Sequence, residues 1–336
     1  MHCFAKVAKD ATGHPLVSGK PSGFGPSDWR RAYGVPGSSV PRIGIVVAKG
    51  DPDLLSDLEQ YSTSFGIATL LACRSTTQTQ CLDIRTQDGG NGMKGGDSGW
   101  ALETALDTET VHGICPRCRI EVVAANSAST QDLLTAVDQS IALGSTIISM
   151  SWGGSEFAAE VNLESHFASA GVSFVSSSGD NGYGTSWPAV SPHVLAVGGT
   201  TLAFSGTSAT ETAWTGSGSG CSKYEAKPIW QADNICKNRS MADISADANP
   251  SSGAAVFRGA WYRVGGTSLA APIIAGYAAS HGGVSPSRFY RLAGLLRDIS
   301  GGTNGNCSQI KAYLCNAGVG YDGPTGLGSL TGQFAW

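Results

Sequence analysis

The sequence predicts an α/β fold in which helices cover both faces of a mainly parallel central sheet. Short apolar stretches of strand type alternate with stretches of helical periodicity, at the rhythm that crossovers between parallel strands require. No internal repeat or linker-like stretch divides the 336 residues, so we expect one domain over residues 23–336. Residues 1–22 are expected to be an N-terminal extension.

The individual elements follow from local pattern. Residues 1–40 and 74–98 are rich in glycine or polar side chains and are expected to be loops, and 203–265 to be loop with short β pieces. Apolar runs predict strands at 43–48, 67–73, 120–125, 146–149, 172–176, 194–197 and 254–257. Helical periodicity predicts helices at 53–65, 99–113, 130–143, 156–170, 268–280 and 288–296.

The composition excludes several classes of function. The net charge is −4 and only 14 % of residues are charged, so nothing favours nucleic acid or an anionic membrane surface as a partner. No apolar run approaches the ~18 residues of a membrane-spanning helix. A surface of glycine and hydroxyl groups does not depend on ionised carboxylates, which is compatible with an acidic environment.

Eight of the nine cysteines form four pairs of near neighbours. The pairs are Cys73/Cys81, Cys115/Cys118, Cys221/Cys236 and Cys307/Cys315, and Cys3 is left over. This spacing favours local disulfides in a secreted protein. A zinc half-site or a redox motif is the alternative for Cys115 and Cys118, but a zinc site needs a second close pair of that spacing.

The stretch Gly265-Gly266-Thr267-Ser268-Leu269-Ala270-Ala271-Pro272 opens an apolar helical run. Thr267 or Ser268 can cap this helix, which places Ser268 at the positive end of the helix dipole. A nucleophile benefits from that place because oxyanion charge develops beside it. An ordinary N-cap is the simpler interpretation of the same residues.

Two carboxylates share one face of the helix predicted at 99–113. At 100° per residue, Glu103 and Asp107 lie on a stripe with Trp100, Val111 and Ile114. Like charges at this spacing repel, and burial adds a desolvation cost, so a buried pair must hold a proton or have a partner. The alternative is a solvated face that exposes Trp100 and Val111.

A third acidic residue, Asp180, follows the strand predicted at 172–176 in the run Ser178-Gly179-Asp180. Ligands in open α/β sheets bind at the carboxyl ends of strands. A simple turn aspartate is the alternative.

Together these three pieces make the chain resemble the sedolisins, the serine-carboxyl peptidases of family S53, which have a subtilisin-like fold. The matching motifs run in order from about residue 23 to 328, and the local cysteine pairs look like those of a bacterial branch. The motifs are Glu103-x-x-Leu106-Asp107, Ser149-Met150-Ser151-Trp152-Gly153, Ser178-Gly179-Asp180, Trp187-Pro188-Ala189, Ala196-Val197-Gly198-Gly199-Thr200, Asp243-Ile244-Ser245-Ala246-Asp247 and Gly266-Thr267-Ser268 with Pro272.

The resemblance implies a role for each of four residues. Ser268 would be the nucleophile, Glu103 its general base, Asp107 the support of that base, and Asp180 a member of the oxyanion hole. The physical chemistry agrees. A histidine is protonated in acid and cannot then act as a base, whereas a carboxyl pair that shares a proton titrates in the acidic range. A protonated Asp180 can donate to an oxyanion as an amide would.

The resemblance also implies one structural calcium ion near the C-terminus. Its ligands would be the carboxylates of Asp298 and Asp322 and the carbonyls of Ile299, Gly318 and Gly320, with water completing the oxygen shell. No other cofactor is expected.

The sequence therefore predicts a secreted, acid-acting serine-carboxyl endopeptidase that forms an acyl-enzyme on protein or peptide substrates. It is expected to be a monomer without nucleic-acid or membrane partners. One alternative is a subtilisin-type peptidase with a histidine triad, but the nearest histidine, His112, lies ~140° around the helix from Asp107. The other is an inactive, calcium-stabilised binding protein.

Overall fold

A central, mainly parallel sheet organises the computed structural model, which describes residues 1–332 and, at 309–311, the backbone alone. The strand order is β12-β11-β10-β8-β4-β7-β6-β5, and β15 also pairs with β11. The β11–β12 pair is antiparallel and the other pairs in this sheet are parallel. The strands are β4 Arg42–Ala48, β5 Leu71–Ala72, β6 Cys81–Thr86, β7 Arg119–Ala125, β8 Ile147–Met150, β10 Ser173–Ser177, β11 Val194–Ser205, β12 Ser208–Ala213 and β15 Ile244–Asp247.

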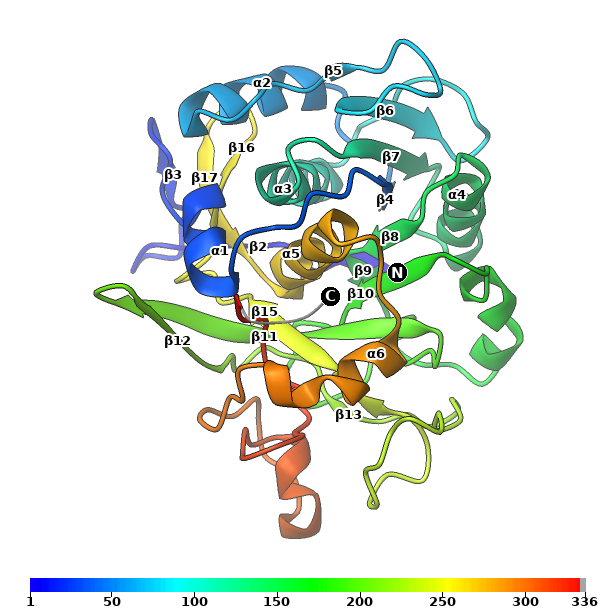
Figure 1. Ribbon diagram of the computed structural model, residues 1–336, viewed down its shortest axis with the longest axis vertical. Helices are drawn as coiled ribbons and strands as arrows, with labels where there is room; N and C mark the ends of the chain where they lie inside the picture. The colour runs from blue at the N-terminus through cyan, green and yellow to red at the C-terminus, as the bar shows by residue number, and fades with distance from the viewer. Residues whose placement is uncertain (333–336) are drawn as a thin grey trace.

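Helices cover both faces of this sheet (Figure 1). The helices α3 and α5 pack side by side against one face, and α4 packs against β4 and β7 on the other. The predicted α/β architecture, with helices on both faces of a mainly parallel sheet, is therefore confirmed. The helices are α1 Pro26–Tyr33, α2 Leu54–Phe65, α3 Ser98–Ile114, α4 Thr130–Ala142, α5 Thr267–Ser280 and α6 Pro286–Arg291, with 3-10 turns at Glu160–Asn162, Glu164–Phe167, Ala293–Leu295 and Gln309–Leu314.

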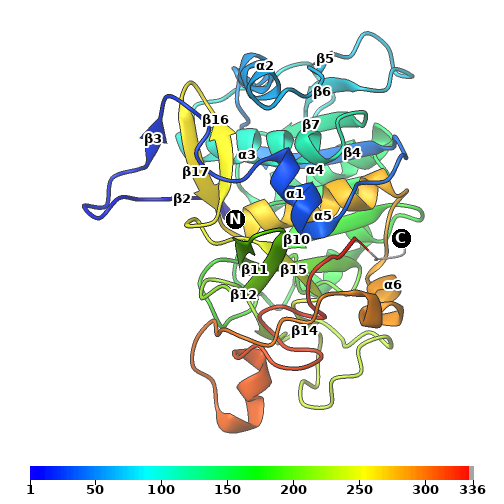
Figure 2. The ribbon, with the colours of Figure 1, turned by 60° about the vertical axis from the view of Figure 1, so that its left-hand side comes forward.

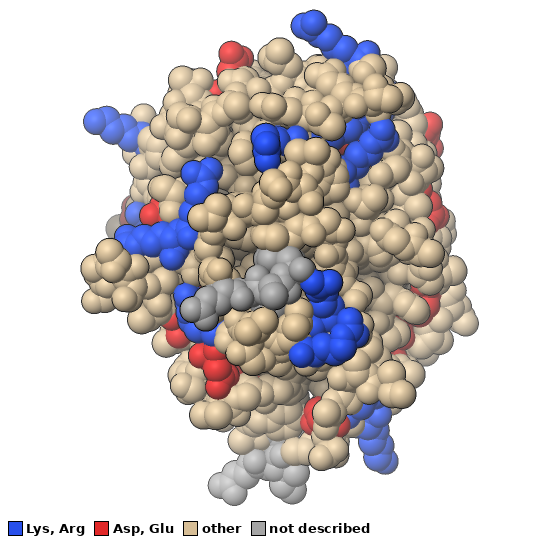
Figure 3. Space-filling view, in the orientation of Figure 1, with Lys and Arg blue, Asp and Glu red and all other residues tan. Residues whose placement is uncertain are grey.

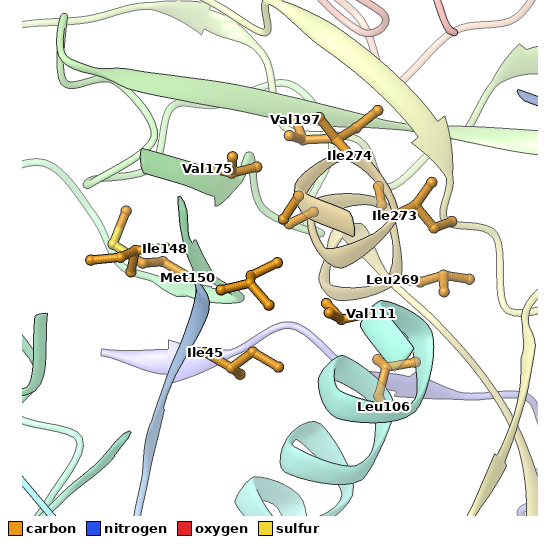
Figure 4. Close-up of a cluster of buried hydrophobic side chains, with 14 of the residues drawn as sticks. Ile45, Leu106, Val111, Ile148, Met150, Val175, Val197, Leu269, Ile273 and Ile274 are labelled. Atoms are coloured by element: carbon orange, nitrogen blue, oxygen red, sulfur yellow. The ribbon is translucent and has the colours of Figure 1, made fainter. Parts of the chain in front are cut away.

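The core lies where α3 and α5 meet the sheet. Figure 4 shows Leu106 and Val111 of α3 facing Leu269 of α5, beside apolar side chains of the strands. These residues are fully buried. Removing side chains of this size from water provides most of the driving force for assembling the layers. The core thus fixes α3 and α5, which carry two of the expected site motifs, relative to each other.

The N-terminal residues pair with strands outside the central sheet. Strand β1 (His2–Cys3) pairs with β9 (Trp152–Gly153), and β2 (Lys6–Val7) and β3 (Val17–Ser18) pair with β17 (Trp261–Gly265). Strand β16 (Ala254–Phe257) completes the latter ribbon, and β13 (Gly220–Cys221) pairs with β14 (Ser240–Met241). Figure 2 shows β2 and β3, in dark blue, beside the yellow β17. The residues expected to be loop thus form part of the fold.

Three other local predictions are wrong. Residues 156–170 form two short 3-10 turns instead of a helix, residues 74–98 contain β6, and residues 1–40 contain α1. The strand expected at 67–73 shortens to β5. In the 156–170 segment, the Glu160 carboxylate accepts from the backbone N–H of Phe157 at 2.7 Å. This side chain to backbone bond stabilises a tight turn, which competes with a continuous helix.

The predicted disulfides are all present. Bonds join Cys73–Cys81, Cys115–Cys118, Cys221–Cys236 and Cys307–Cys315, and Cys3 is a free thiol. In the part of the chain that the structure describes, no helix is both long and apolar enough to cross a membrane. On the face seen in Figure 3, charged side chains are scattered over a surface that is mostly uncharged.

Candidate active site

The four predicted catalytic residues meet at the carboxyl ends of β8 and β10, beside α3 and the first turn of α5. Ser268 is the second residue of α5, so its backbone lies among the free N–H groups of the helix start. Gly266, with φ 96°, is the N-cap instead of the expected Thr267 or Ser268. A positive φ of this size suits glycine, and a Cβ here would lie 1.8 Å from the carbonyl oxygen of Phe4.

Ser268, Glu103 and Asp107 form a connected, fully buried group. The Ser268 hydroxyl donates to Glu103 Oε2 at 2.8 Å. The other oxygen of Glu103 and Asp107 Oδ2 are both buried and have no hydrogen-bond partner among the described residues. Two buried carboxyls this close in one group repel if both are ionised, so the pair is stable when it holds a proton.

Burial governs the protonation of this pair. Desolvation, and then the charge of Asp107, raise the pKa of Glu103 well above its ordinary value. Desolvation likewise raises the pKa of Asp107, although the hydrogen bond from Ser151 opposes the rise. The buried stripe predicted on α3 is therefore present, and the solvated-face alternative is wrong.

Asp180 follows β10 and contacts Thr267, the residue before Ser268. Its Oδ1 accepts from the backbone N–H and the hydroxyl of Thr267, at 2.7 and 2.8 Å. Its Oδ2 is buried and receives no hydrogen bond from residues 1–332. Desolvation raises the pKa of Asp180 to about 7. Below that pH, Asp180 carries a proton that Oδ2 can donate.

Two residues without a predicted catalytic role also hold the group together. The Ser151 hydroxyl donates to Asp107 Oδ1 at 2.7 Å, and Thr267 orients Asp180. Ser151 directly follows the last residue of β8, so the rule that sites gather at strand ends could have singled it out. No comparable local signal marks Thr267, because its partner is 87 residues away.

No histidine takes part in this group. Among the hydrogen bonds of residues 1–332, none joins a histidine to Ser268, Glu103 or Asp107. His112 is buried on α3, and desolvation lowers its pKa to about 4. These contacts disfavour a subtilisin-type histidine triad.

The residues predicted to bind calcium lie apart from this group, in the C-terminal loops. The Gly320 N–H donates to Asp298 Oδ2 and the Gly318 N–H to Asp322 Oδ2, both at 3.0 Å. Burial raises the pKa of Asp322 to about 7, and the charge of nearby Asp298 adds to the rise. Two neighbouring carboxylates in loops fit a hard cation with oxygen ligands, although no three His, Cys, Asp or Glu residues gather for a metal within 1–332.

The fold and this group define a class: a subtilisin-like α/β protein whose serine is paired with buried carboxyls. Residues 91–289, more than half of the chain, match the model of the subtilase family. The chain belongs to the subtilase family, and its sequence relatives within this fold are sedolisins, which confirms the predicted resemblance.

Three similar proteins illustrate the relationship. Sedolisin of Pseudomonas sp. (strain 101) is 29 % identical over 98 % of this chain, and kumamolisin of Bacillus sp. (strain MN-32) is 28 % identical over 94 %. The chain spans 63 % of the length of each of these relatives. The structure of Pseudomonas sedolisin, a serine-carboxyl proteinase complexed with pseudo-iodotyrostatin, matches with a TM-score of 0.75 at 28 % identity, covering 93 % of this chain and 96 % of that one.

Proposed function

We propose that this protein is a serine-carboxyl endopeptidase that hydrolyses peptide bonds of proteins or peptides through an acyl-enzyme on Ser268. The observation that carries the proposal is the 2.8 Å hydrogen bond from the Ser268 hydroxyl to Glu103, which Asp107 backs. A serine hydroxyl is a weak nucleophile unless an adjacent base takes its proton. Glu103 is placed to be that base.

The proposed reaction uses each carboxyl in turn. Glu103 takes the hydroxyl proton as Ser268 Oγ attacks the substrate carbonyl. Because this base is a carboxylate, it becomes neutral when protonated, whereas a histidine base would become positively charged. Asp180, protonated on Oδ2, donates to the developing oxyanion together with the start of α5. Glu103 then returns the proton to the leaving amine, and water, deprotonated by the same carboxylate, hydrolyses the ester.

This assignment of roles explains an acid preference. Asp180 must be protonated to donate, and Glu103 must have lost its proton to act as base while Asp107 keeps the shared one. Burial raises all three pKa values. The oxyanion donor is therefore lost as pH rises through about 7.

Two further properties belong to the proposal. Asp298 and Asp322, with the carbonyls of Ile299, Gly318 and Gly320, would hold one calcium ion, which would tie the C-terminal loops to the domain. The four disulfides support secretion, because such bonds persist in oxidising compartments.

A pH–activity profile on casein, with mass-spectrometric mapping of the cleavage sites, tests the function. We expect activity in acid and a loss of at least about 10³-fold in kcat/KM for Ser268→Ala. Glu103→Gln removes the base and is expected to cost about 10²–10⁴-fold. Glu59→Gln, an exposed change on α2, is the matched control. Near-normal turnover by Ser268→Ala or Glu103→Gln contradicts the proposal.

A further inference from the structure

A cavity of about 560 Å³ lies between three segments from the C-terminal part of the chain. The segments are the loop 230–240, helix α6 with Tyr290, and residues 313–327. In Figure 1 they lie below β11, whereas α3 lies above it. The cavity shares no lining residue with the one formed by Gly179 and Asp180 at the candidate active site. Its volume falls within the roughly 300–1,000 Å³ typical of ligand sites.

Four aromatic rings line this cavity. The ring centroid of Trp230 is 4.7 Å from that of Tyr290, and the ring of Tyr321 is 6.3 Å from those of both Tyr290 and Tyr313. The guanidinium of the buried Arg239 lies 5.0 Å from the centre of the Trp230 ring and supports it by a cation–π contact. Walls of this kind favour a flat aromatic ligand, because rings attract one another in offset and edge-to-face arrangements.

The cavity offers no unpaired charge to a ligand. Asp233 is the charged residue among the described residues that line it, and it forms an ion pair with Lys227 at 2.9 Å. Burial opposes the charge of Asp233, but hydrogen bonds from Tyr313 and Lys227 outweigh this effect and lower its pKa. Its carboxylate also accepts from the backbone N–H groups of Ile235 and Cys236 and from the hydroxyl of Ser240. A charged ligand would lose its hydration without gaining a partner, so an uncharged one is favoured.

The hydroxyl of Tyr321, in contrast, is left unsatisfied. It is buried and has no hydrogen-bond partner among the described residues. The hydroxyls of Tyr290 and Tyr313 donate to Asp243 and Asp233. An unbonded buried hydroxyl costs free energy, which a polar atom on the ligand would recover. The cavity therefore suits a ring that carries one hydrogen-bonding group, such as a phenol or an indole.

Exposed apolar side chains extend this surface beyond the cavity. Ile235, which lines it, is 42 % exposed, and Ile229, next to Trp230 in the sequence, is fully exposed. Exposed apolar side chains beside an apolar cavity are typical of a contact surface for a partner larger than one ring.

We propose, building on the proposed peptidase function, that this cavity is a second contact site for protein substrates and binds a tyrosine or tryptophan side chain of the polypeptide. A substrate held there has a raised effective concentration at Ser268. The site should therefore lower KM for proteins without changing the chemical step.

The first test measures the binding of N-acetyl-tyrosinamide and N-acetyl-phenylalaninamide to the full-length Ser268→Ala protein by ligand-observed NMR. We expect a Kd of about 1 mM for the tyrosine compound. Tyr321→Phe should weaken its binding about 2–10-fold, the value of one neutral hydrogen bond, and leave the phenylalanine compound unaffected. Ile235→Asp should weaken both by about tenfold or more, because it places a charge in an apolar site. Tyr224→Phe, at an exposed tyrosine outside the cavity, should change neither.

Absence of binding overturns the inference, and so does binding that Tyr321→Phe and Ile235→Asp leave unchanged. Because Tyr321→Phe keeps the ring and removes one oxygen, this outcome does not depend on a disruptive substitution.

Kinetics with Ser268 intact separate this inference from the proposed function. On casein, Ile235→Asp should raise KM about 3–10-fold and leave kcat unchanged, because the lost contact is remote from the reacting bond. A hexapeptide without tyrosine or tryptophan should be hydrolysed as well by this variant as by the wild type. An unchanged KM for casein overturns the inference and leaves the function standing. If the wild-type protein hydrolyses neither substrate at any pH and still binds the ring, the proposed function and the substrate role both fail, and only the aromatic site stands.

Discussion

Asp180 has two oxygens in different surroundings, and that difference decides what it can do. Oδ1 is held by two donors from Thr267, whereas the buried Oδ2 receives none from the described residues. A proton on Oδ2 removes the cost of burying a charge and supplies a donor at the same time. Asp180 is therefore expected to be neutral in acid.

Replacing Asp180 by Asn separates its donor function from its titration. Asn donates at every pH, so Asp180→Asn should lose some activity at the acidic optimum, less than the about 10²–10³-fold expected from deleting an oxyanion donor. It should also lose proportionally less between pH 5 and 8, because the wild-type donor disappears as pH rises through about 7. The measurement is the relative kcat/KM profile of variant and wild type on one substrate.

Glu103 and Asp107 titrate as a coupled pair, so a control is needed for their contribution. Asp53→Asn, an exposed aspartate without a side-chain cap bond before α2, should leave the profile unchanged. If the activity of Asp180→Asn falls with rising pH as that of the wild type does, then ionisation of Asp180 does not limit the reaction, and the pair must account for the proposed acid preference.

The sequence predicts those site residues whose signal is local. Glu103 and Asp107 stand four apart on an apolar stripe, and Asp180 follows a strand, so spacing makes them candidates. The resemblance to sedolisins then favours them over a solvated face and a simple turn. Thr267 and the N-terminal residues Phe4 and Ala5 are different, because their partners are far away in the sequence. Only the folded chain brings these together.

At the level of elements, the difference between local signals and distant partners likewise separates the correct predictions from the wrong ones. Helices α3 and α5 follow from their apolar periodicity and form where expected. Strand β6 was missed because it carries Asp83 and Arg85 in place of an apolar run. Its Asp83 accepts from the buried Arg119 of β7 at 2.5 Å. A charge pair between neighbouring strands stabilises β6, and no local sequence pattern indicates this pair.

The C-terminal loops are an element whose order is expected to depend on calcium. Only the folded chain brings Asp298 and Asp322 together, so an ion bound there stabilises the folded state by mass action, by about 2.7 kcal/mol at 100 times Kd. Chelation should lower Tm by several degrees, and added calcium, but not magnesium, should restore it. Thermal unfolding with metal analysis measures this.

Asp298→Asn provides the matched variant for this prediction. It should melt at a lower temperature than wild type in calcium and respond little to the chelator. An unchanged melting curve after verified metal removal would mean that these residues form plain turns, in which the Gly320 N–H satisfies Asp298 and donors from Gly318 and Thr325 satisfy Asp322.

At the scale of the whole molecule, neutral buried carboxyls are spread well beyond the site. Burial raises the pKa of Glu109, on the far part of α3, and of Asp247, at the end of β15, well above their ordinary values. Neither group is paired with a cation in the ion pairs of residues 1–332. The folded protein therefore holds protons that the unfolded chain releases at about pH 4.

This proton excess predicts that stability falls as pH rises. Between about pH 4, where unfolded carboxyls ionise, and about pH 7, where Asp180 does so in the folded protein, the folded state binds more protons, so the free energy of unfolding decreases with pH. The Ser268→Ala variant, which cannot digest itself under the proposed mechanism, should melt about 5 °C or more lower at pH 7.5 than at pH 4.5.

Glu109→Gln should reduce that difference, because glutamine keeps the oxygen that accepts from Phe257 at 3.0 Å and cannot ionise. The exposed Glu59→Gln should not. A Tm that rises from pH 4.5 to 7.5 would mean that these carboxyls are ionised and paired in the folded protein, and would contradict this prediction.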